Sequence, residues 1–199
     1  GMSYDTRIGS KFLNAGIGYG GSCFPKDTKA LSWLASYNDN EIKTIKAAIE
    51  VNESQKLKPV KKASKYYKDF RGLNVAVLGL TFKPGTDDLR EAPSLVTVPI
   101  LVDDGANIKA WDPVGCDNFK KHVPEGITYC ETIEETLKGA DICFIFTEWP
   151  EVKVLNPSVF VEKMRHPIVI DGRNCFSVKD IKGVPMVYES IGRAVIDNR

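Results

Sequence analysis

Residues 73–80, LNVAVLGL, decide how the larger part of this chain folds. They form a continuous run of apolar, mostly branched residues that contains a glycine, which is typical of a parallel strand buried on both faces. Beyond this run the sequence alternates between helical and extended segments. This alternation predicts a doubly wound α/β domain, in which helices cover both faces of a parallel sheet. We expect helices over 94–106, 116–123, 131–140 and 157–164, and further strands over 107–113, 127–130, 140–149, 166–174 and 184–192.

The residues before Gly72 have a different character. Residues 41–70 are rich in Lys, Glu, Ala and Ile, with isoleucines at three- and four-residue steps. This spacing predicts a long helix with one apolar face, kinked or restarted at Pro59. Acidic residues are interspersed among its lysines, which indicates a solvated face rather than a binding patch. We therefore expect a helical part over 1–71, too small to bury much of its own surface, and an α/β domain over 72–199.

Composition excludes several classes of protein. The chain has 199 residues with 27 basic and 26 acidic side chains, so a net charge of +1 gives no electrostatic reason to bind nucleic acid. No apolar run approaches the ~18 residues of a membrane span, and the N-terminus lacks the apolar region of a signal peptide. The five cysteines are widely spaced, and only two histidines are present. These counts argue against a disulfide framework and against a metal site, and they favour a reducing, cytoplasmic setting.

A glycine cluster, GIGYGGSCFPKD, occupies residues 16–27. Three of its glycines formally satisfy the pattern GxGxxG, but a dinucleotide-binding turn requires a buried strand directly before it, and the preceding residues are polar. Glycine lets the backbone approach a neighbour closely or adopt a positive φ, while a flexible connector is the alternative explanation. Pro25 fits the first turn of a helix, which places Cys23 at or just before a helix N-terminus.

Cys23 is therefore the candidate nucleophile. Unpaired N–H groups and the helix dipole stabilise a thiolate at this position, and a thiolate beside a glycine loop is suited to covalent catalysis. In a helical first turn Asp27 points to the same side, where it would position a water or act as a base, and Lys26 adds a cation. The other four cysteines lack these features, and Cys143 is expected in the core.

A second cluster, GLTFKPGTDDLR, follows the first strand at residues 79–90. It lies at the carboxyl edge of the predicted sheet, where ligands bind in such folds, but its single early glycine argues against a standard NAD turn. Lys83 and Arg90 suit either phosphate groups or ion pairs with neighbouring acids. Asp112 ends the second strand, where a ribose-binding acid often sits, and Arg173 follows the fifth. Three basic groups at one edge favour an anionic ligand.

Together these motifs resemble the nucleotide-sugar dehydrogenase family, with the closest match among bacterial UDP-glucose 6-dehydrogenases. The resemblance rests on DTRIG, FLNAG, GYGGSCFPKD, GLTFKPGTDDLREAP and DGRN. It covers essentially the whole chain but only the carboxyl half of the family's length. It implies part of a helical central dimerisation domain followed by a Rossmann-like domain that binds the UDP-sugar, and hence a homodimer or higher homo-oligomer. It also implies an NAD-binding domain upstream, so we expect this chain alone to bind NAD poorly and not to turn over substrate.

The resemblance further implies a four-electron oxidation of UDP-glucose to UDP-glucuronate with NAD as cofactor. A first hydride transfer gives an aldehyde, to which Cys23 adds as a thiohemiacetal; a second gives a thioester that water hydrolyses. Asp27 matches a position that assists base or water chemistry, and Lys26 and Arg90 match positions that contact NAD. The alternatives are GDP-mannose or UDP-N-acetylmannosamine as substrate, or a non-catalytic nucleotide-binding or dimerisation module. The presence of Cys23 together with Asp27 argues against such a module.

The same resemblance implies a set of residues that hold the sugar nucleotide. Six of them form the loop that wraps it, one is a substrate-binding lysine, one is an arginine near the substrate, and one is an arginine that reaches the partner subunit's substrate across the dimer. In that order they are Phe12, Leu13, Asn14, Ala15, Gly16 and Gly20, then Lys83, Arg173 and Arg7.

Overall fold

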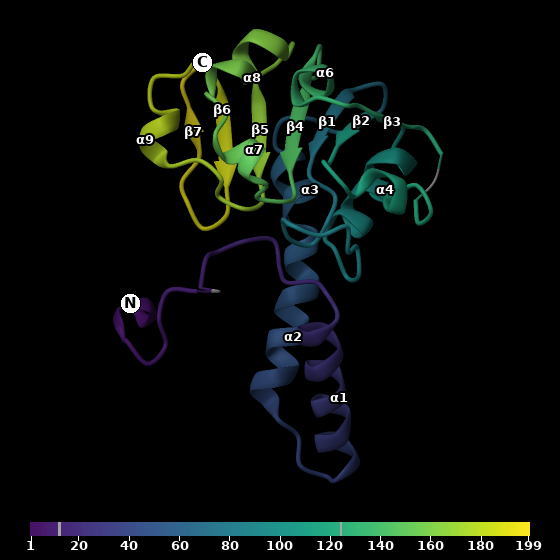
Figure 1. The fold of residues 1–199 in the computed structure, drawn as a ribbon, viewed down its shortest axis with the longest axis vertical. Coiled ribbons are helices and arrows are strands. Elements are labelled where there is room, and N and C mark those ends of the chain that lie inside the picture. Colours follow the sequence, from purple (N-terminus) through teal and green to yellow (C-terminus); the bar gives the residue numbers. More distant parts are fainter. Residues whose placement is uncertain (12, 124) are drawn as a thin grey trace.

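A seven-stranded sheet forms the centre of the larger domain in the described part of the chain (Figure 1). The computed structural model describes residues 1–11, 13–123 and 125–199. Along the sheet the order is β3-β2-β1-β4-β5-β6-β7; the first six strands are parallel, and β7 pairs antiparallel with β6. This order confirms the predicted doubly wound arrangement. The strands are β1 (Asn74–Leu78), β2 (Asn107–Trp111), β3 (Ile127–Tyr129), β4 (Ile142–Ile145), β5 (Ile168–Asp171), β6 (Val187–Ser190) and β7 (Ile196–Asp197).

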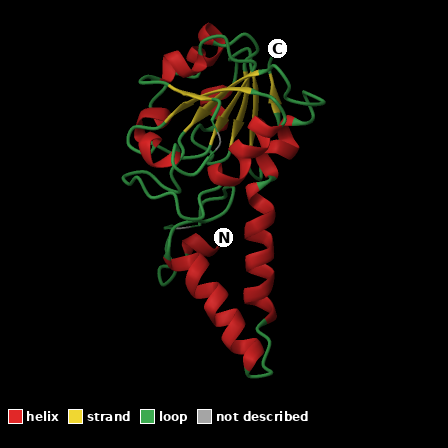
Figure 2. Ribbon diagram, turned by 90° about the vertical axis from the view of Figure 1, so that its right-hand side faces the viewer, coloured by secondary structure: helices red, strands yellow, loops and turns green. Residues whose placement is uncertain are grey.

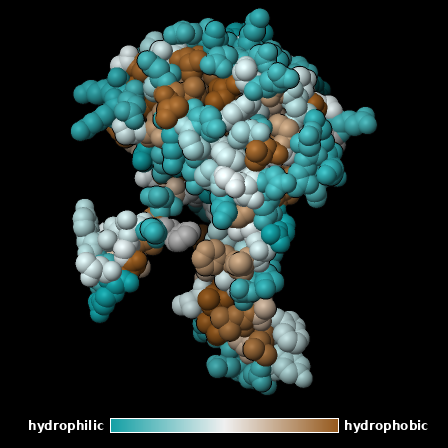
Figure 3. Space-filling view, in the orientation of Figure 1, coloured by the Kyte–Doolittle hydropathy of each residue, from teal (hydrophilic) through white to brown (hydrophobic). Residues whose placement is uncertain are grey.

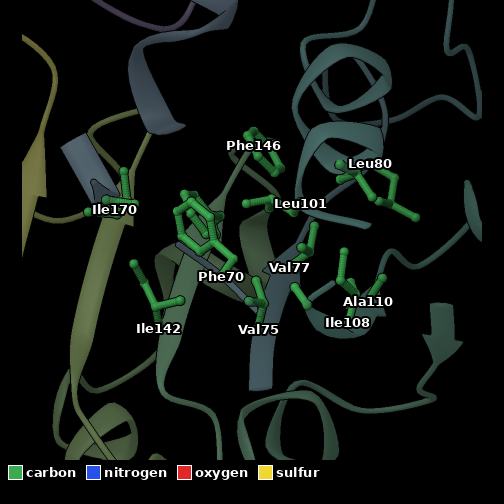
Figure 4. Close-up of a cluster of buried hydrophobic side chains, with 14 of the residues drawn as sticks. Phe70, Val75, Val77, Leu80, Leu101, Ile108, Ala110, Ile142, Phe146 and Ile170 are labelled. Atoms are coloured by element: carbon green, nitrogen blue, oxygen red, sulfur yellow. The ribbon is translucent and has the colours of Figure 1, made fainter. Parts of the chain in front are cut away.

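Helices cover both faces of this sheet (Figure 2). Alternate residues of each strand point to opposite faces, so Val75 and Val77 of β1 join one buried cluster while Ala76 and Leu78 join another. Figure 4 shows the first of these clusters. Cys143 is fully buried in the second, as expected. The helices are α4 (Ser94–Asp103), α5 (Cys116–Phe119), α6 (Ile133–Leu137), α7 (Pro150–Lys153), α8 (Ser158–Lys163) and α9 (Val178–Ile181).

The strand β7 and the helices α7 and α9 were not expected from the sequence. β7 has two residues, and each of the two helices has four. Segments this short complete no period of apolar residues, so their pattern carries no signal. No helix in the described ranges is long and apolar enough to cross a membrane.

The N-terminal part forms a helical hairpin that projects from the sheet domain (Figure 1). After a short 3-10 helix, η1 (Met2–Tyr4), come α1 (Cys23–Tyr37), α2 (Lys43–Lys56) and α3 (Lys58–Ala63). The predicted restart at Pro59 is confirmed: α2 ends just before Leu57, and Pro59 lies in the first turn of α3. Proline is tolerated there because the N–H groups of a first turn have no partner within the helix.

Helix α3 and the segment after it are fixed to the sheet. Ala63 and Phe70 belong to the buried cluster of the first face. Glu189 of β6 is fully buried and accepts hydrogen bonds from Lys62 Nζ at 2.8 Å and from Tyr66 Oη at 2.8 Å, while Lys65 Nζ lies 2.9 Å away. Burial opposes ionisation of Glu189, but these three donors keep the pKa of its carboxyl below the usual range. These contacts hold the helical hairpin at a defined place on the sheet. The division of the chain into two domains at residue 71 stays a prediction.

Candidate functional site

The glycine loop over 16–21 passes tightly between the sheet edge and α2. Gly21 has φ +81°, and a Cβ there would lie 2.8 Å from the ring of Phe82. A Cβ at Gly20 would lie 2.8 Å from the carbonyl oxygen of Glu91. Both requirements that the sequence suggested, a close approach and a positive φ, are therefore real, and a flexible connector does not explain them. No strand precedes the loop within residues 1–11 and 13–15, in agreement with the rejection of a dinucleotide-binding turn.

Polar side chains hold this loop by its backbone. Asn52 Oδ1 accepts a hydrogen bond from the N–H of Tyr19 at 2.7 Å, and Asn52 Nδ2 donates to the carbonyl of Tyr19 at 3.2 Å. Gln55 Nε2 donates to the carbonyl of Gly16 at 3.0 Å. Asn52 is 5% exposed, so its side-chain amide takes the place of water as the hydrogen-bond partner of the Tyr19 backbone. The C-terminal half of α2 thus fixes the loop that leads to Cys23.

Arg173 connects the same loop to the sheet. Its Nη1 donates to the carbonyl of Gly18 and its Nε to the carbonyl of Phe146, each at 2.9 Å. The side chain is 12% exposed, and Glu148 Oε2 lies 3.4 Å from Nε. Burial lowers the pKa of the Arg173 guanidinium, and the Glu148 carboxylate partly offsets this. Two of its donors are occupied by the backbone, so Arg173 joins the glycine loop to the end of β4; contact with a substrate stays a prediction.

Cys23 is the first residue of α1, which confirms the predicted position at a helix N-terminus. The residue is exposed, and its Sγ lies 3.8 Å from the hydroxyl of Ser22. Asp27 follows one turn later on the same helix face, also exposed, with Lys26 Nζ 3.1 Å from its Oδ1. The thiol, the carboxylate and the ammonium group therefore share one solvent-accessible helix end.

The loop after β1 brings Arg90 to this helix end. The carbonyl of Arg90 accepts the N–H of Gly21 at 2.7 Å, two residues before Cys23. The Arg90 guanidinium pairs with Asp88, with Nη2 2.7 Å from Oδ2, and this pair raises the pKa of Arg90 and lowers that of Asp88. A smaller part of the rise in the pKa of Arg90 comes from the nearby Cys23 side chain. Arg90 is thus an electrostatic neighbour of the candidate nucleophile.

The sequence left two explanations open for Lys83 and Arg90 at the carboxyl edge of the sheet: an anionic ligand, or an ion pair with a neighbouring acid. Arg90 forms the ion pair with Asp88, yet its side chain is 67% exposed. Lys83 is exposed, with Nζ 5.3 Å from the ring centre of Phe82. A groove of about 640 Å³ opens beside Arg90 and includes Thr86, Leu95, Asn118 and His122 in its lining. Two exposed cations therefore remain accessible to an anion, whereas the third basic group, Arg173, is engaged inside the protein.

The other residues implied by the resemblance that precede the glycine loop are exposed where the structure describes them. Arg7 is exposed and pairs with Asp5, with Nη2 2.6 Å from Oδ2. The N-terminal segment containing Arg7 extends away from the hairpin (Figure 1). Leu13, Asn14 and Ala15 are exposed. Phe12 lies outside the described residues.

Asp112 has a different task from the one expected. It is 5% exposed, and its Oδ2 accepts the N–H of Leu80 at 2.7 Å and the indole N–H of Trp149 at 2.9 Å. Its Oδ1 accepts the N–H of Gly115 at 2.7 Å. Both oxygens are occupied, so the expectation of a ribose-binding acid is wrong. Asp112 instead joins the ends of β1, β2 and β4 at the carboxyl edge of the sheet.

Sequence reasoning missed four residues of this site. Three lie on one face of α2 at helical spacing, and the fourth follows Arg90: Asn52, Gln55, Lys56 and Glu91. The lysines of this segment were expected on a solvated face, but Lys56 is only 2% exposed and pairs with Glu91 at 2.9 Å. The i, i+3, i+4 spacing of the first three was the available signal. Among the described residues, no group of three or more His, Cys, Asp and Glu side chains is arranged to hold a metal.

Two regions of the chain match one protein family. Residues 1–54 match the central domain of the UDP-glucose/GDP-mannose dehydrogenase family, and residues 76–178 match its UDP-binding domain. The chain is 42% identical over 196 residues to UDP-glucose 6-dehydrogenase YwqF of Bacillus subtilis (strain 168). That alignment covers 98% of this chain but 44% of the relative, so the chain spans less than half the relative's length.

Solved structures of similar proteins extend over both the hairpin and the sheet domain. A UDP-glucose dehydrogenase from the hyperthermophilic archaeon Pyrobaculum islandicum superposes with a TM-score of 0.83 at 33% identity, covering 97% of this chain and 42% of that one. A UDP-D-ManNAc dehydrogenase from Pyrococcus horikoshii superposes with a TM-score of 0.72 at 31% identity, covering 89% of this chain and 40% of that one.

Proposed function

Because this chain belongs to the UDP-glucose/GDP-mannose dehydrogenase family, we propose that it is the carboxyl portion of an NAD-dependent UDP-glucose 6-dehydrogenase. The enzyme would oxidise UDP-glucose to UDP-glucuronate. The observation that carries the proposal is Cys23, an exposed thiol at the start of α1 behind a glycine loop held against the sheet edge. A thiol in this place suits an oxidation that passes through an aldehyde, because a thiolate traps the aldehyde covalently.

In the proposed reaction the C6 alcohol first loses a hydride and a proton and becomes an aldehyde. Cys23 Sγ then attacks the aldehyde carbon: the S–C bond forms, the carbonyl oxygen takes a proton, and a thiohemiacetal results. Loss of a second hydride and a proton gives a thioester. Water attacks the thioester carbon, the C–S bond breaks, and the uronate leaves while the thiol is restored. Asp27, one turn along the same helix face, is placed to orient that water or accept its proton.

Two NAD molecules, bound one after the other, would each accept one of the two hydrides. The residues of this chain fit part of such a site. Lys26 and Arg90 are exposed cations beside Cys23, suited to phosphate oxygens. The sheet edge itself does not fit a dinucleotide. Both carboxylate oxygens of Asp112 already accept hydrogen bonds and are not free for a ribose. Thr147 also packs directly against Gly79, so no space is left beside this glycine. We therefore assign to this chain a contribution to the NAD site through Lys26 and Arg90.

The UDP-sugar would lie at the carboxyl edge of the sheet, on the exposed side of the glycine loop. The exposed residues Leu13, Asn14 and Ala15 lead into this loop and offer backbone groups to the substrate. Lys83 supplies an exposed ammonium group for the diphosphate. The remaining residues proposed for substrate binding are Phe12, Gly16, Gly20, Arg173 and, from the partner subunit, Arg7. A cytoplasmic location is part of the proposal, because the nucleophile must stay a free thiol.

A thermal-shift comparison of the full-length protein tests the substrate. A ligand at about 100 times its dissociation constant stabilises the folded protein by ~2.7 kcal/mol, and at the same concentration a weaker ligand stabilises it less. At equal concentrations UDP-glucose should therefore raise the melting temperature more than GDP-mannose or UDP-N-acetylmannosamine. The last compound is the second candidate, favoured by the 31% identity to the Pyrococcus horikoshii enzyme. NADH should form with the same preference. A larger shift and faster NADH formation with another sugar nucleotide would replace UDP-glucose as the proposed substrate.

The hairpin carries the surface proposed for dimerisation. Apolar side chains gather on it (Figure 3). The exposed ones include Leu31, Trp33, Leu34, Tyr37 and Val51, with Trp33 stacked on Tyr37 at 5.3 Å between ring centres. An exposed apolar area of this kind marks an interaction surface, and we propose that a second copy of the chain covers it.

The substitution Trp33→Lys should therefore weaken self-association. Trp33 is 66% exposed, so the variant is expected to fold, but a buried interface tryptophan contributes about 2 kcal/mol or more, which is roughly 30-fold in the dimer dissociation constant. Sedimentation equilibrium of the full-length protein measures it. Val154→Lys, at an exposed valine on the sheet domain, is the control and should leave the dimer intact. An unchanged dissociation constant for Trp33→Lys would reject the surface.

A further inference from the structure

We propose that Glu91 is a positioning residue for the reaction: its carboxylate joins both helices of the hairpin to the loop that carries Arg90, and so fixes Cys23 relative to Arg90. The inference rests on the proposed function, because that function gives a role to Cys23 and to Arg90, the two groups that Glu91 aligns. It differs from the substrate and NAD contacts above, since Glu91 acts through Lys56 and Lys29.

The contacts of Glu91 reach two helices. Its Oε2 lies 2.9 Å from Lys56 Nζ and its Oε1 lies 2.8 Å from Lys29 Nζ. Lys56 is the last residue of α2 and is 2% exposed, whereas Lys29 lies on α1, six residues after Cys23. A buried ammonium group depends on its carboxylate partners. One side chain of the β1–α4 connection therefore holds both halves of the hairpin.

The backbone of the same connection contacts the glycine loop. The carbonyl of Arg90 accepts the N–H of Gly21 at 2.7 Å, and the carbonyl of Glu91 lies 2.8 Å from the place of a Cβ at Gly20. Glu91 itself has φ +56°, a left-handed conformation that costs a non-glycine residue about 1–2 kcal/mol. Such a conformation persists where the surrounding contacts determine it, and here those contacts are the two ion pairs and the packed glycine loop.

The loss of the Glu91 carboxylate should change the distance between the Arg90 guanidinium and the Cys23 thiol. Arg90 is held by Asp88 from within its own loop, and Cys23 begins the helix that carries Lys29. Without the Glu91 carboxylate, the loop and the helix lose the ion pair between them. The Gly21–Arg90 hydrogen bond and the packing of the glycine loop against Phe82 are then left to hold them. A misplacement of about 1 Å in a reacting group costs up to ~100-fold in rate. Glu91 therefore affects the rate of the chemical step more than the affinity for the sugar nucleotide.

The test compares Glu91→Gln with Glu53→Gln in the full-length protein. Glu53 pairs with the same Lys56 Nζ at 3.0 Å, but it lies on α2 and links no second element, so it is a matched control. For Glu91→Gln we expect kcat for UDP-glucose oxidation to fall by about 10-fold or more, with KM changed by less than ~3-fold. Alkylation of Cys23 by iodoacetamide should slow several-fold, because the thiolate loses its alignment with Arg90. For Glu53→Gln both quantities should stay within ~2-fold of wild type.

Equal kcat and equal alkylation rates for the two variants would overturn the proposal, as would a loss confined to KM. If Glu91→Gln fails to fold, as judged by its melting curve, Lys29→Gln decides instead. Lys29 is half-exposed, so its substitution costs little stability. It should still lower kcat about 3-fold at constant KM, and an unchanged kcat would reject the role. If the wild-type protein does not oxidise UDP-glucose, the proposed function fails, while the alkylation of Cys23 still tests the alignment without any substrate.

Discussion

Replacing Cys23 with serine is expected to abolish uronate formation by the full-length protein. A serine hydroxyl is scarcely ionised near neutral pH and is a far weaker nucleophile than a thiolate, so the covalent trapping of the aldehyde is lost. We expect kcat for UDP-glucuronate formation to fall by at least ~1,000-fold, in the range observed when a catalytic nucleophile is removed. Production of the uronate, followed by chromatography together with NADH absorbance, measures the effect.

Cys130→Ser is the matched control for this experiment. Cys130 is a half-buried free cysteine at the end of β3, on the far side of β2 from β1. Its replacement removes a thiol without touching the helix end at Cys23 and should leave kcat within ~2-fold. Wild-type rates for Cys23→Ser would remove the nucleophile from the proposed mechanism. A comparable loss for both variants would mean that serine substitution damages the fold and not the chemistry.

Replacing Arg173 with methionine should cost the folded protein about 2–4 kcal/mol. The guanidinium donates to the carbonyls of Gly18 and Phe146, and methionine supplies no donor to either. It also leaves the Glu148 carboxylate, whose Oε2 is buried, without its cation. Each unsatisfied buried group costs ~1–3 kcal/mol, and partial access of water to the loop lowers the total. Urea unfolding of the two proteins at one pH measures the difference.

Arg199→Met is the control for this substitution. Arg199 pairs with Asp197 at 2.9 Å, and both side chains are about half-exposed, so the loss should stay under about 1 kcal/mol. Arg173→Met should additionally loosen the glycine loop, which hydrogen exchange at the Ile17 amide, a donor to the carbonyl of Gly172, reports. An unfolding free energy no lower than that of Arg199→Met would show that the contacts of Arg173 add nothing to stability.

Local pattern was enough to predict the scaffold and the position of the candidate nucleophile at a helix N-terminus. The period of apolar residues predicted six parallel strands and the helices between them, because a buried parallel strand needs an uninterrupted apolar run. Pro25 and Pro59 predicted where helices begin, because proline restricts its own φ and lacks an N–H. The motifs around Cys23 and Lys83 identified the family, which the matches over 1–54 and 76–178 confirm. These signals each lie within a few consecutive residues.

Only the tertiary structure decided which polar groups are free for a ligand. Arg173 meets Gly18 across 155 positions of the sequence, and Lys56 meets Glu91 across 35. Asp112 and Trp149, 37 positions apart, form a hydrogen bond that removes the carboxylate from the list of ligand-binding groups. A side chain's charge and position in the sequence say that it will seek a partner, but the partner is chosen by which segments the fold brings within hydrogen-bond distance. The sequence therefore determined the sheet, the helix ends and the exposed thiol, and the packing of distant segments determined how its polar neighbours are used.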